Sequence, residues 1–194
     1  MSAPSAPGRG LRITVVLAGN EPGPLFDAHL HYNATDATQY SPQQIIASLE
    51  RNGIEQAVVS GTPASHTASL YRQAPRRIVP LLGVYRSRDD KIAWPDDATL
   101  PERVEAELDR GPWRGIGELH IFAEQRRSPV FLRIVELATA RGLPLLMHCD
   151  PVVIDTLFDH APDATVIWAH AGAYPYPSLL RDYLMARAES LAQA

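Results

Sequence analysis

Residues 141–148 read RGLPLLMH and contain a complete junction between a helix and a strand. Gly142 is of the residue type that ends helices, because glycine readily adopts the left-handed backbone conformation found just after them. The apolar run at 144–148 has the length of a buried strand and ends in His148. The same order of helix end, glycine and apolar run recurs at Asn52, Gly53 and Ile54.

Outward from these two junctions, the sequence from residue 25 alternates between apolar runs and helical stretches. The expected strands occupy residues 25–31, 56–61, 78–85, 115–120, 144–148 and 165–170. The expected helices occupy residues 42–52, 65–73, 101–110, 128–142, 152–160 and a stretch from 178 onward. This alternation is typical of βα units with a parallel sheet. We predict an α/β fold of the (β/α)8 TIM-barrel type that is incomplete, with about six of its eight βα units.

The composition of the 194 residues excludes several classes of protein. Hydrophobic residues make up 45% and charged residues 21%, as in ordinary globular domains, and the net charge of −4 without a basic stripe argues against nucleic acid. No apolar run approaches the roughly 20 residues of a membrane span. We expect a flexible leader at 1–24, a domain at 25–194 and a cytoplasmic location. The short apolar run at 11–18 is the alternative sign of export.

Four of the expected strands end in side chains that bind metals. On the first strand, Asp27, His29 and His31 point to one face because strand side chains alternate, while Phe26, Ala28 and Leu30 point to the other. We expect the polar face to line the barrel interior and the apolar face to pack against helices. The two histidines then lie at the carboxyl end of the strand, where barrels of this type carry their active sites.

The other three strands add similar groups. Glu118 and His120 share a face of the fourth strand, His148 and Asp150 share a face of the fifth, and His170 ends the sixth. Since the carboxyl ends of parallel barrel strands meet at one face, we expect these side chains to lie together. Imidazole and carboxylate ligands suit zinc, with manganese or iron as alternatives.

Several residues near these motifs have more than one interpretation. Asp150 supports the ligands or is the N-cap of the next helix. Tyr85 and Arg86 contact substrate or begin a solvated loop, and His120 is a ligand, a substrate contact or a polar rim residue. Cys149 is expected to be a buried residue of the packed interior. Because it is the single cysteine, the chain has no internal disulfide. Gly115 and Gly117 add no bulk beside Glu118, which suggests room for a ligand there.

Residues 25–172 resemble the amidohydrolase superfamily of metal-dependent hydrolases. The resemblance rests on four motifs in this order along the chain: Phe-Asp-Ala-His-Leu-His, Gly-Ile-Gly-Glu, Met-His and Ala-His-Ala-Gly. The resemblance is to its amidohydrolase-related and TatD-like branches. It implies that His29, His31, Glu118, His148 and His170 bind the metal. It also implies that a metal-activated water attacks a C–N, C–O or P–O bond of a small molecule. Asp27, His120, Asp150 and Arg86 are then candidates for contacting substrate or supporting the ligands.

The sequence departs from the family at the aspartate that follows strand eight, which binds metal and acts as general base. We find no strand seven, strand eight or matching aspartate after His170. This predicts weak hydrolysis by the isolated chain, and open strand edges favour self-association. The alternatives are a non-oxidative decarboxylase of the same family and a metal-binding barrel without activity.

Overall fold

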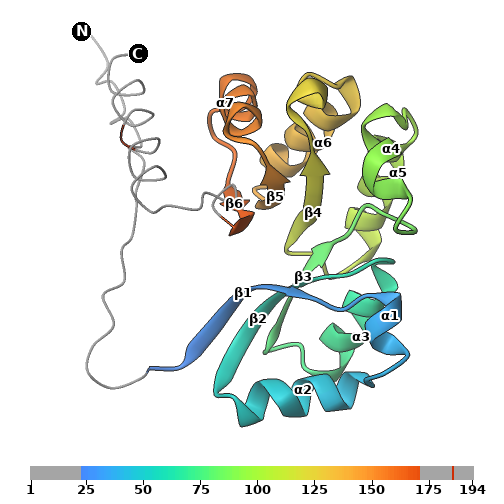
Figure 1. Ribbon diagram of the computed structural model, residues 1–194, viewed down its shortest axis with the longest axis vertical. Helices are drawn as coiled ribbons and strands as arrows, with labels where there is room; N and C mark the ends of the chain where they lie inside the picture. Colours follow the sequence, from blue (N-terminus) through green and yellow to red (C-terminus); the bar gives the residue numbers. More distant parts are fainter. Residues whose placement is uncertain (1–22, 171–184, 186–194) are drawn as a thin grey trace, which may run out of the picture. The chain divides into compact units, whose positions relative to one another are not determined.

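The computed structural model describes residues 23–170 and Met185. The chain divides into two compact units, and most of the first, Met1–Gly23 with Tyr174–Ala194, lies outside the described residues. The expected leader and the expected last helix therefore lie outside them too. In the second unit, six strands form one sheet in the order β1-β2-β3-β4-β5-β6, and all neighbours are parallel (Figure 1). The prediction of an α/β fold with a parallel sheet is confirmed.

The strands alternate with helices along the described part of the chain. The strands are β1 (Leu25–His31), β2 (Ile54–Ser60), β3 (Ile78–Leu82), β4 (Gly115–Ile121), β5 (Leu145–Cys149) and β6 (Val166–Trp168). The α-helices are α1 (Ala34–Ala37), α2 (Pro42–Arg51), α3 (Ser65–Gln73), α4 (Asp90–Ala93), α5 (Leu100–Arg110), α6 (Pro129–Ala140) and α7 (Pro151–His160). The 3₁₀ turns are η1 (Trp94–Asp96) and η2 (Ala123–Gln125). No helix in these residues is long and apolar enough to cross a bilayer.

The helix limits follow from local capping. Before α2, the Ser41 hydroxyl accepts a hydrogen bond from the Gln44 backbone N–H, and the Gln44 side chain accepts one from the Ser41 N–H. This reciprocal pair satisfies two backbone donors that a helix start leaves free. After the helix, Gly53 has a φ of +68°, and Gly142 after α6 has a φ of +62°. These two glycines therefore end their helices as the sequence predicted.

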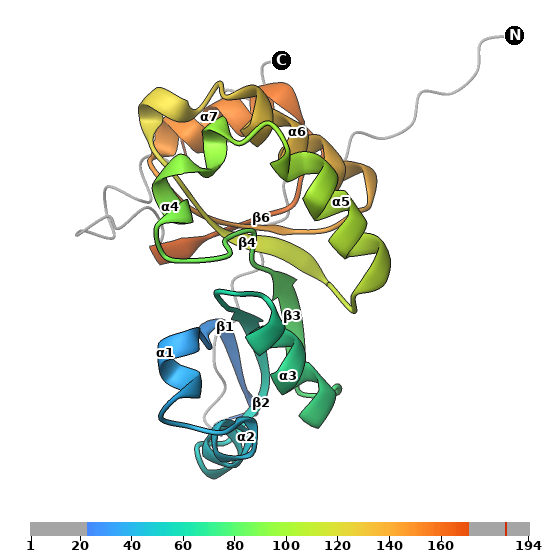
Figure 2. The same ribbon diagram turned by 90° about the vertical axis from the view of Figure 1, so that its right-hand side faces the viewer.

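Two apolar clusters fix helices onto the outer face of the sheet. Figure 2 shows α5, α6 and α7 on one side of β4 and β6. Ile116 of β4 and Leu145 of β5 are fully buried there, together with Phe131 of α6. A second cluster buries Val59 of β2 against Leu70 of α3. Burial of side chains of this size stabilises the fold by about 1.5–3 kcal/mol each.

A third cluster shows that the sheet is curled. It contains Val58 of β2, Leu81 of β3 and Leu146 of β5. Neighbouring strands lie about 4.8 Å apart, so β2 and β5 would be separated by about 14 Å on a flat sheet. At the two ends of the sheet, the rings of His29 on β1 and His170 after β6 have centroids only 5.0 Å apart. The curvature therefore brings the first and last strands toward each other.

Two expectations about the strands are wrong. Phe26 is 55% exposed and Ala28 is also exposed, so the described helices leave this part of β1 uncovered, and only Leu30 at its far end packs against the second cluster. The reason is that α2, the long helix after β1, packs against β2 and α3. In addition, β6 ends at Trp168, so His170 lies two residues beyond the strand, with a φ of +54°.

Candidate metal centre

A buried carboxylate, Glu118 of β4, lies at the centre of five imidazole rings. Its side chain is only 4% exposed. One oxygen, Oε1, lies 3.4 Å from His29 Nε2, 3.1 Å from His148 Nδ1 and 3.9 Å from His170 Nε2. The other oxygen, Oε2, lies 3.2 Å from His31 Nε2 and 3.4 Å from His120 Nε2. The structure thus brings together all five expected ligands, with His120 beside them.

The end of β1 is shaped by a bulge that places its two histidines. Pairing with β2 shifts register between Asp27 and Leu30, and bulges of this kind re-aim side chains. The Asp27 carboxylate accepts a hydrogen bond of 3.0 Å from the His29 backbone N–H. Asp27 therefore supports the backbone of the bulge.

His31 is oriented by a neighbour on β2. Its Nδ1 lies 2.9 Å from the Ser60 hydroxyl, which leaves Nε2 facing Glu118 and 3.0 Å from His29 Nε2. A hydrogen bond to one ring nitrogen fixes the orientation of a histidine that uses the other nitrogen as a ligand. The sequence analysis did not identify Ser60, because it lies on a different strand from the histidine that it orients.

The two glycines of β4 before Glu118, Gly115 and Gly117, allow neighbouring strands to approach closely. Gly117 has a φ of +139°, and a Cβ atom there would lie 2.5 Å from the Leu146 carbonyl oxygen of β5. A Cβ atom at Gly115 would lie 2.7 Å from a Leu81 methyl group and from the Pro144 carbonyl oxygen. The expectation of room for a ligand is wrong for Gly115, where Leu81 and Pro144 occupy the space. Gly117 is closed toward β5 but lines a cavity of about 40 Å³ together with Glu118 and His120. The register shift between Gly117 and Leu119 lies at Glu118 itself.

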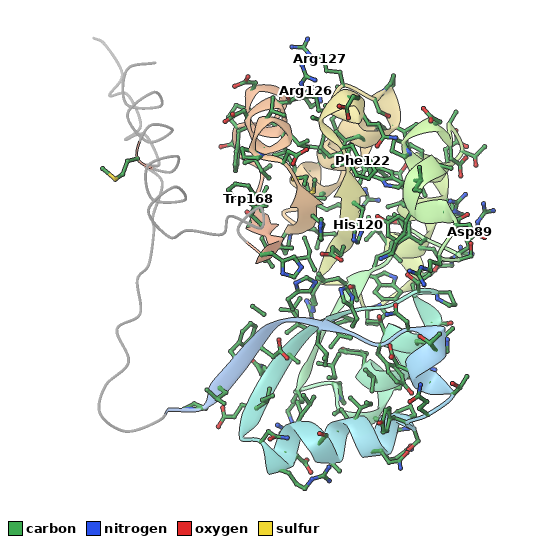
Figure 3. All side chains as sticks on the ribbon, in the orientation of Figure 1. Asp89, His120, Phe122, Arg126, Arg127 and Trp168 are labelled. Carbon is green, nitrogen blue, oxygen red and sulfur yellow. The ribbon has the colours of Figure 1, made fainter. Side chains whose placement is uncertain are left out.

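His120 is held from both sides of its peptide backbone. Its N–H donates a 2.7 Å hydrogen bond to the Tyr85 hydroxyl, and its carbonyl accepts a 2.7 Å bond from Trp94 Nε1. Its ring stacks on that of His148, its register partner on β5, with centroids 4.5 Å apart. Figure 3 labels His120 on β4. Trp94, which lies between the expected strand at 78–85 and the expected helix at 101–110, is a supporting residue that the sequence did not reveal.

The protonation states suit metal binding. Burial raises the pKa of Glu118, but the hydrogen bond from His31 and the attraction of the imidazoles His120, His31 and His29 outweigh it and lower the pKa to about 2. Burial lowers the pKa of His120 to about 4 and also lowers that of His29. At neutral pH the carboxylate is therefore charged and these two rings are neutral, which are the forms that bind metals.

Three other residues singled out in the sequence lie apart from the cluster. Asp150 is exposed at the N-cap position of α7, although its side chain makes no capping hydrogen bond. The exposed Arg86 binds Asp90 through its backbone N–H at 2.8 Å and its side-chain Nε at 3.3 Å. Cys149 is buried, and burial raises its pKa to about 12. This confirms the prediction that Cys149 is a buried residue of the packed interior.

The spacing of the donor atoms fits a metal ion. Ligand atoms about 2.0–2.1 Å from a tetrahedral zinc lie about 3.3 Å from one another. Two three-residue groups in the described residues keep all their ligand atoms within 4.8 Å: His29, Glu118 and His170, and Glu118, His120 and His148. His120, for which the sequence left open a ligand, a substrate contact or a polar rim residue, lies within ligand distance of Glu118 and His148.

The chain was also compared with known proteins. Neither the family models nor the curated proteins that were searched match it. The chemistry of the cluster is therefore what a proposal about function has to explain.

Proposed function

We propose that this protein is a metal-dependent hydrolase of the amidohydrolase type, built on an incomplete (β/α)8 barrel that binds zinc around Glu118. The observation that supports it is a buried carboxylate with five imidazole nitrogens 3.1–3.9 Å from its oxygens. Removing a carboxylate from water is costly unless strong partners compensate it, and a divalent cation is such a partner. Manganese and iron accept the same donors.

The two donor groups assign roles to the histidines. His29 and His170 would hold an ion together with Glu118, and so would His120 and His148, so that the cluster offers donors for one ion or for two. When bound there, zinc would lower the pKa of its water to about 7 and polarise the bond to be broken. His31 Nε2, 3.0 Å from His29 Nε2, is close enough to join the first group.

The proton transfers limit the expected rate. Both Glu118 oxygens face imidazoles, and Asp27 is engaged by the His29 backbone. In the described residues, no second carboxylate joins the two donor groups to act as general base. Since a general base contributes about 10²–10⁴-fold, we expect slow hydrolysis by this chain. The same feature favours the second candidate function, a metal-binding barrel without hydrolytic activity.

Metal content after chelation and reloading tests the proposal. We expect the full chain to retain one or two zinc equivalents, and the combined variant His29→Ala and His31→Ala to lose the ion of the first group, so that at most the ion of Glu118, His120 and His148 remains. His160→Ala is the matched control, because this imidazole pairs with Glu136 at 3.1 Å, away from the cluster. Undiminished metal in the double variant would contradict the assignment.

Turnover of the reloaded protein separates the two candidate functions. p-Nitrophenyl acetate and bis(p-nitrophenyl) phosphate report ester and phosphodiester cleavage. Slow hydrolysis that requires zinc and is lost in the double variant supports the hydrolase. Stoichiometric zinc without turnover on any substrate class supports the metal-binding barrel. Fast turnover would contradict the missing-base argument.

A further inference from the structure

A second cavity lies outside the histidine cluster, between α3, the residues after β3 and α5. Its volume is about 480 Å³, within the roughly 300–1,000 Å³ of small-molecule sites. Neither Glu118 nor any of the five histidines around it lines this cavity. It is therefore a separate space with walls of its own.

One wall is an aromatic ring that is held in place. Trp113 Nε1 donates a 3.1 Å hydrogen bond to the Glu107 carbonyl at the end of α5. The ring packs directly on Gly111, where an added Cβ atom would lie 2.0 Å from Nε1. The buried side chains of Leu100 and Val104 continue this wall. An apolar or aromatic molecule would meet a preformed surface here.

The charged part of the lining is mainly cationic. Four arginines line the cavity, whereas Glu107 is the single carboxylate in its described lining; the arginines are Arg72, Arg86, Arg103 and Arg110. The last three pair with Asp90, Asp97 and Glu107 at 2.9–3.3 Å. Arg72 makes no ion pair within the described residues and is exposed. Among the described arginines that line the cavity, Arg72 is thus the one whose guanidinium is not engaged by a carboxylate.

We propose that this cavity is a binding site for a small organic anion whose apolar body packs on Trp113 and whose acid group pairs with Arg72. An aromatic face and a planar cation suit an aromatic carboxylate or sulfonate, since guanidinium groups bind such oxygens in a bidentate manner. The site does not depend on the proposed hydrolase function. It borders the metal cluster through Tyr85, which lines the cavity and holds the His120 N–H at 2.7 Å.

Titration with 8-anilinonaphthalene-1-sulfonate, an aromatic anion whose fluorescence rises on binding, tests the site in the full chain. The neutral N-phenyl-1-naphthylamine has the same aromatic body and tests the charge. We expect saturable binding of the anion, tighter than that of the neutral probe. Arg72→Ala should weaken binding of the anion by up to about fivefold, which corresponds to the loss of one exposed charge pair. Arg51→Ala, an exposed arginine on α2 outside the cavity lining, should leave binding unchanged. Equal binding of both probes, or equal loss in both variants, would overturn the proposal.

Alkylation locates the probe independently of its affinity. Ala68 of α3 lines the cavity, and the native Cys149 is buried. We expect the sulfonate probe to slow iodoacetamide alkylation of the Ala68→Cys variant at least fivefold at saturation. Alkylation of Gln43→Cys, an exposed position on α2, should keep its rate. If the probe leaves the rate at Ala68→Cys unchanged, the anion binds elsewhere and the assignment is wrong.

Discussion

Replacing Gly117 with alanine tests how the strand before Glu118 is built. The residue has a φ of +139°, and a Cβ atom would lie 2.5 Å from the Leu146 carbonyl oxygen and 2.9 Å from the Leu146 Cβ atom. Both neighbours belong to buried β5. The alanine therefore meets an unfavourable backbone conformation and a rigid obstacle at once.

The cost can be worked out from these two effects. A sparsely populated backbone conformation costs about 1–3 kcal/mol, and forcing an extra carbon into a packed core costs about 1–3 kcal/mol more. We expect Gly117→Ala to lower the free energy of unfolding by about 4 kcal/mol, out of a typical 5–15 kcal/mol. Gly53 supplies the matched control, since its φ is +68° but nothing lies within 4 Å of an added Cβ atom. Gly53→Ala should cost only about 1 kcal/mol.

Urea unfolding followed by circular dichroism measures both variants. With a slope of about 2 kcal/mol per M, Gly117→Ala should move the midpoint down by about 2 M and Gly53→Ala by about 0.5 M. Zinc retention by the folded fraction should also fall in Gly117→Ala alone, because Glu118 is the next residue. Equal midpoints for the two variants would refute the proposed close approach of β4 and β5.

Two further substitutions test the support of the cluster and the core. Ser60→Ala removes the hydroxyl 2.9 Å from His31 Nδ1 and should weaken zinc binding by about 10–100-fold; unchanged affinity in a competition titration would show that the ring is fixed in another way. Phe131→Ala empties a fully buried position that contacts the Trp94 ring and should cost about 3–5 kcal/mol. A loss below 1 kcal/mol in urea unfolding would place Phe131 outside the core.

Local signals predicted most of the elements. The serine before α2 and the glycines after α2 and α6 act through hydrogen bonds and backbone angles within a few residues, so they can be read directly. The strands at 115–120 and 144–148 were predicted to within one residue at either end. The connection at 86–100 was different, since α4 and η1 form there with few local signals. Trp94 is fixed by the distant His120 carbonyl.

The candidate site was predicted as a set of residues, without its arrangement. Strand alternation and the order of the motifs pointed to His29, His31 and Glu118. The same reasoning left the role of His120 undecided and expected room for a ligand beside Gly115, where Leu81 and Pro144 lie. Strand alternation also predicted that helices would cover Phe26, which is 55% exposed. Each of these outcomes depends on which strand or helix lies alongside, and alternation within one strand carries no such information.

The sequence by itself determined which side chains stand at the ends of the parallel strands, because strand periodicity and helix caps are properties of short segments. Only the tertiary structure decided how closely these ends converge. Three strand spacings separate β1 from β4, about 14 Å on a flat sheet, yet His29 lies 3.4 Å from Glu118. The curvature that closes this distance comes from twist and from inner packing among Val58, Leu81 and Leu146. Those contacts join residues far apart in the chain, so they exist only once the sheet has formed.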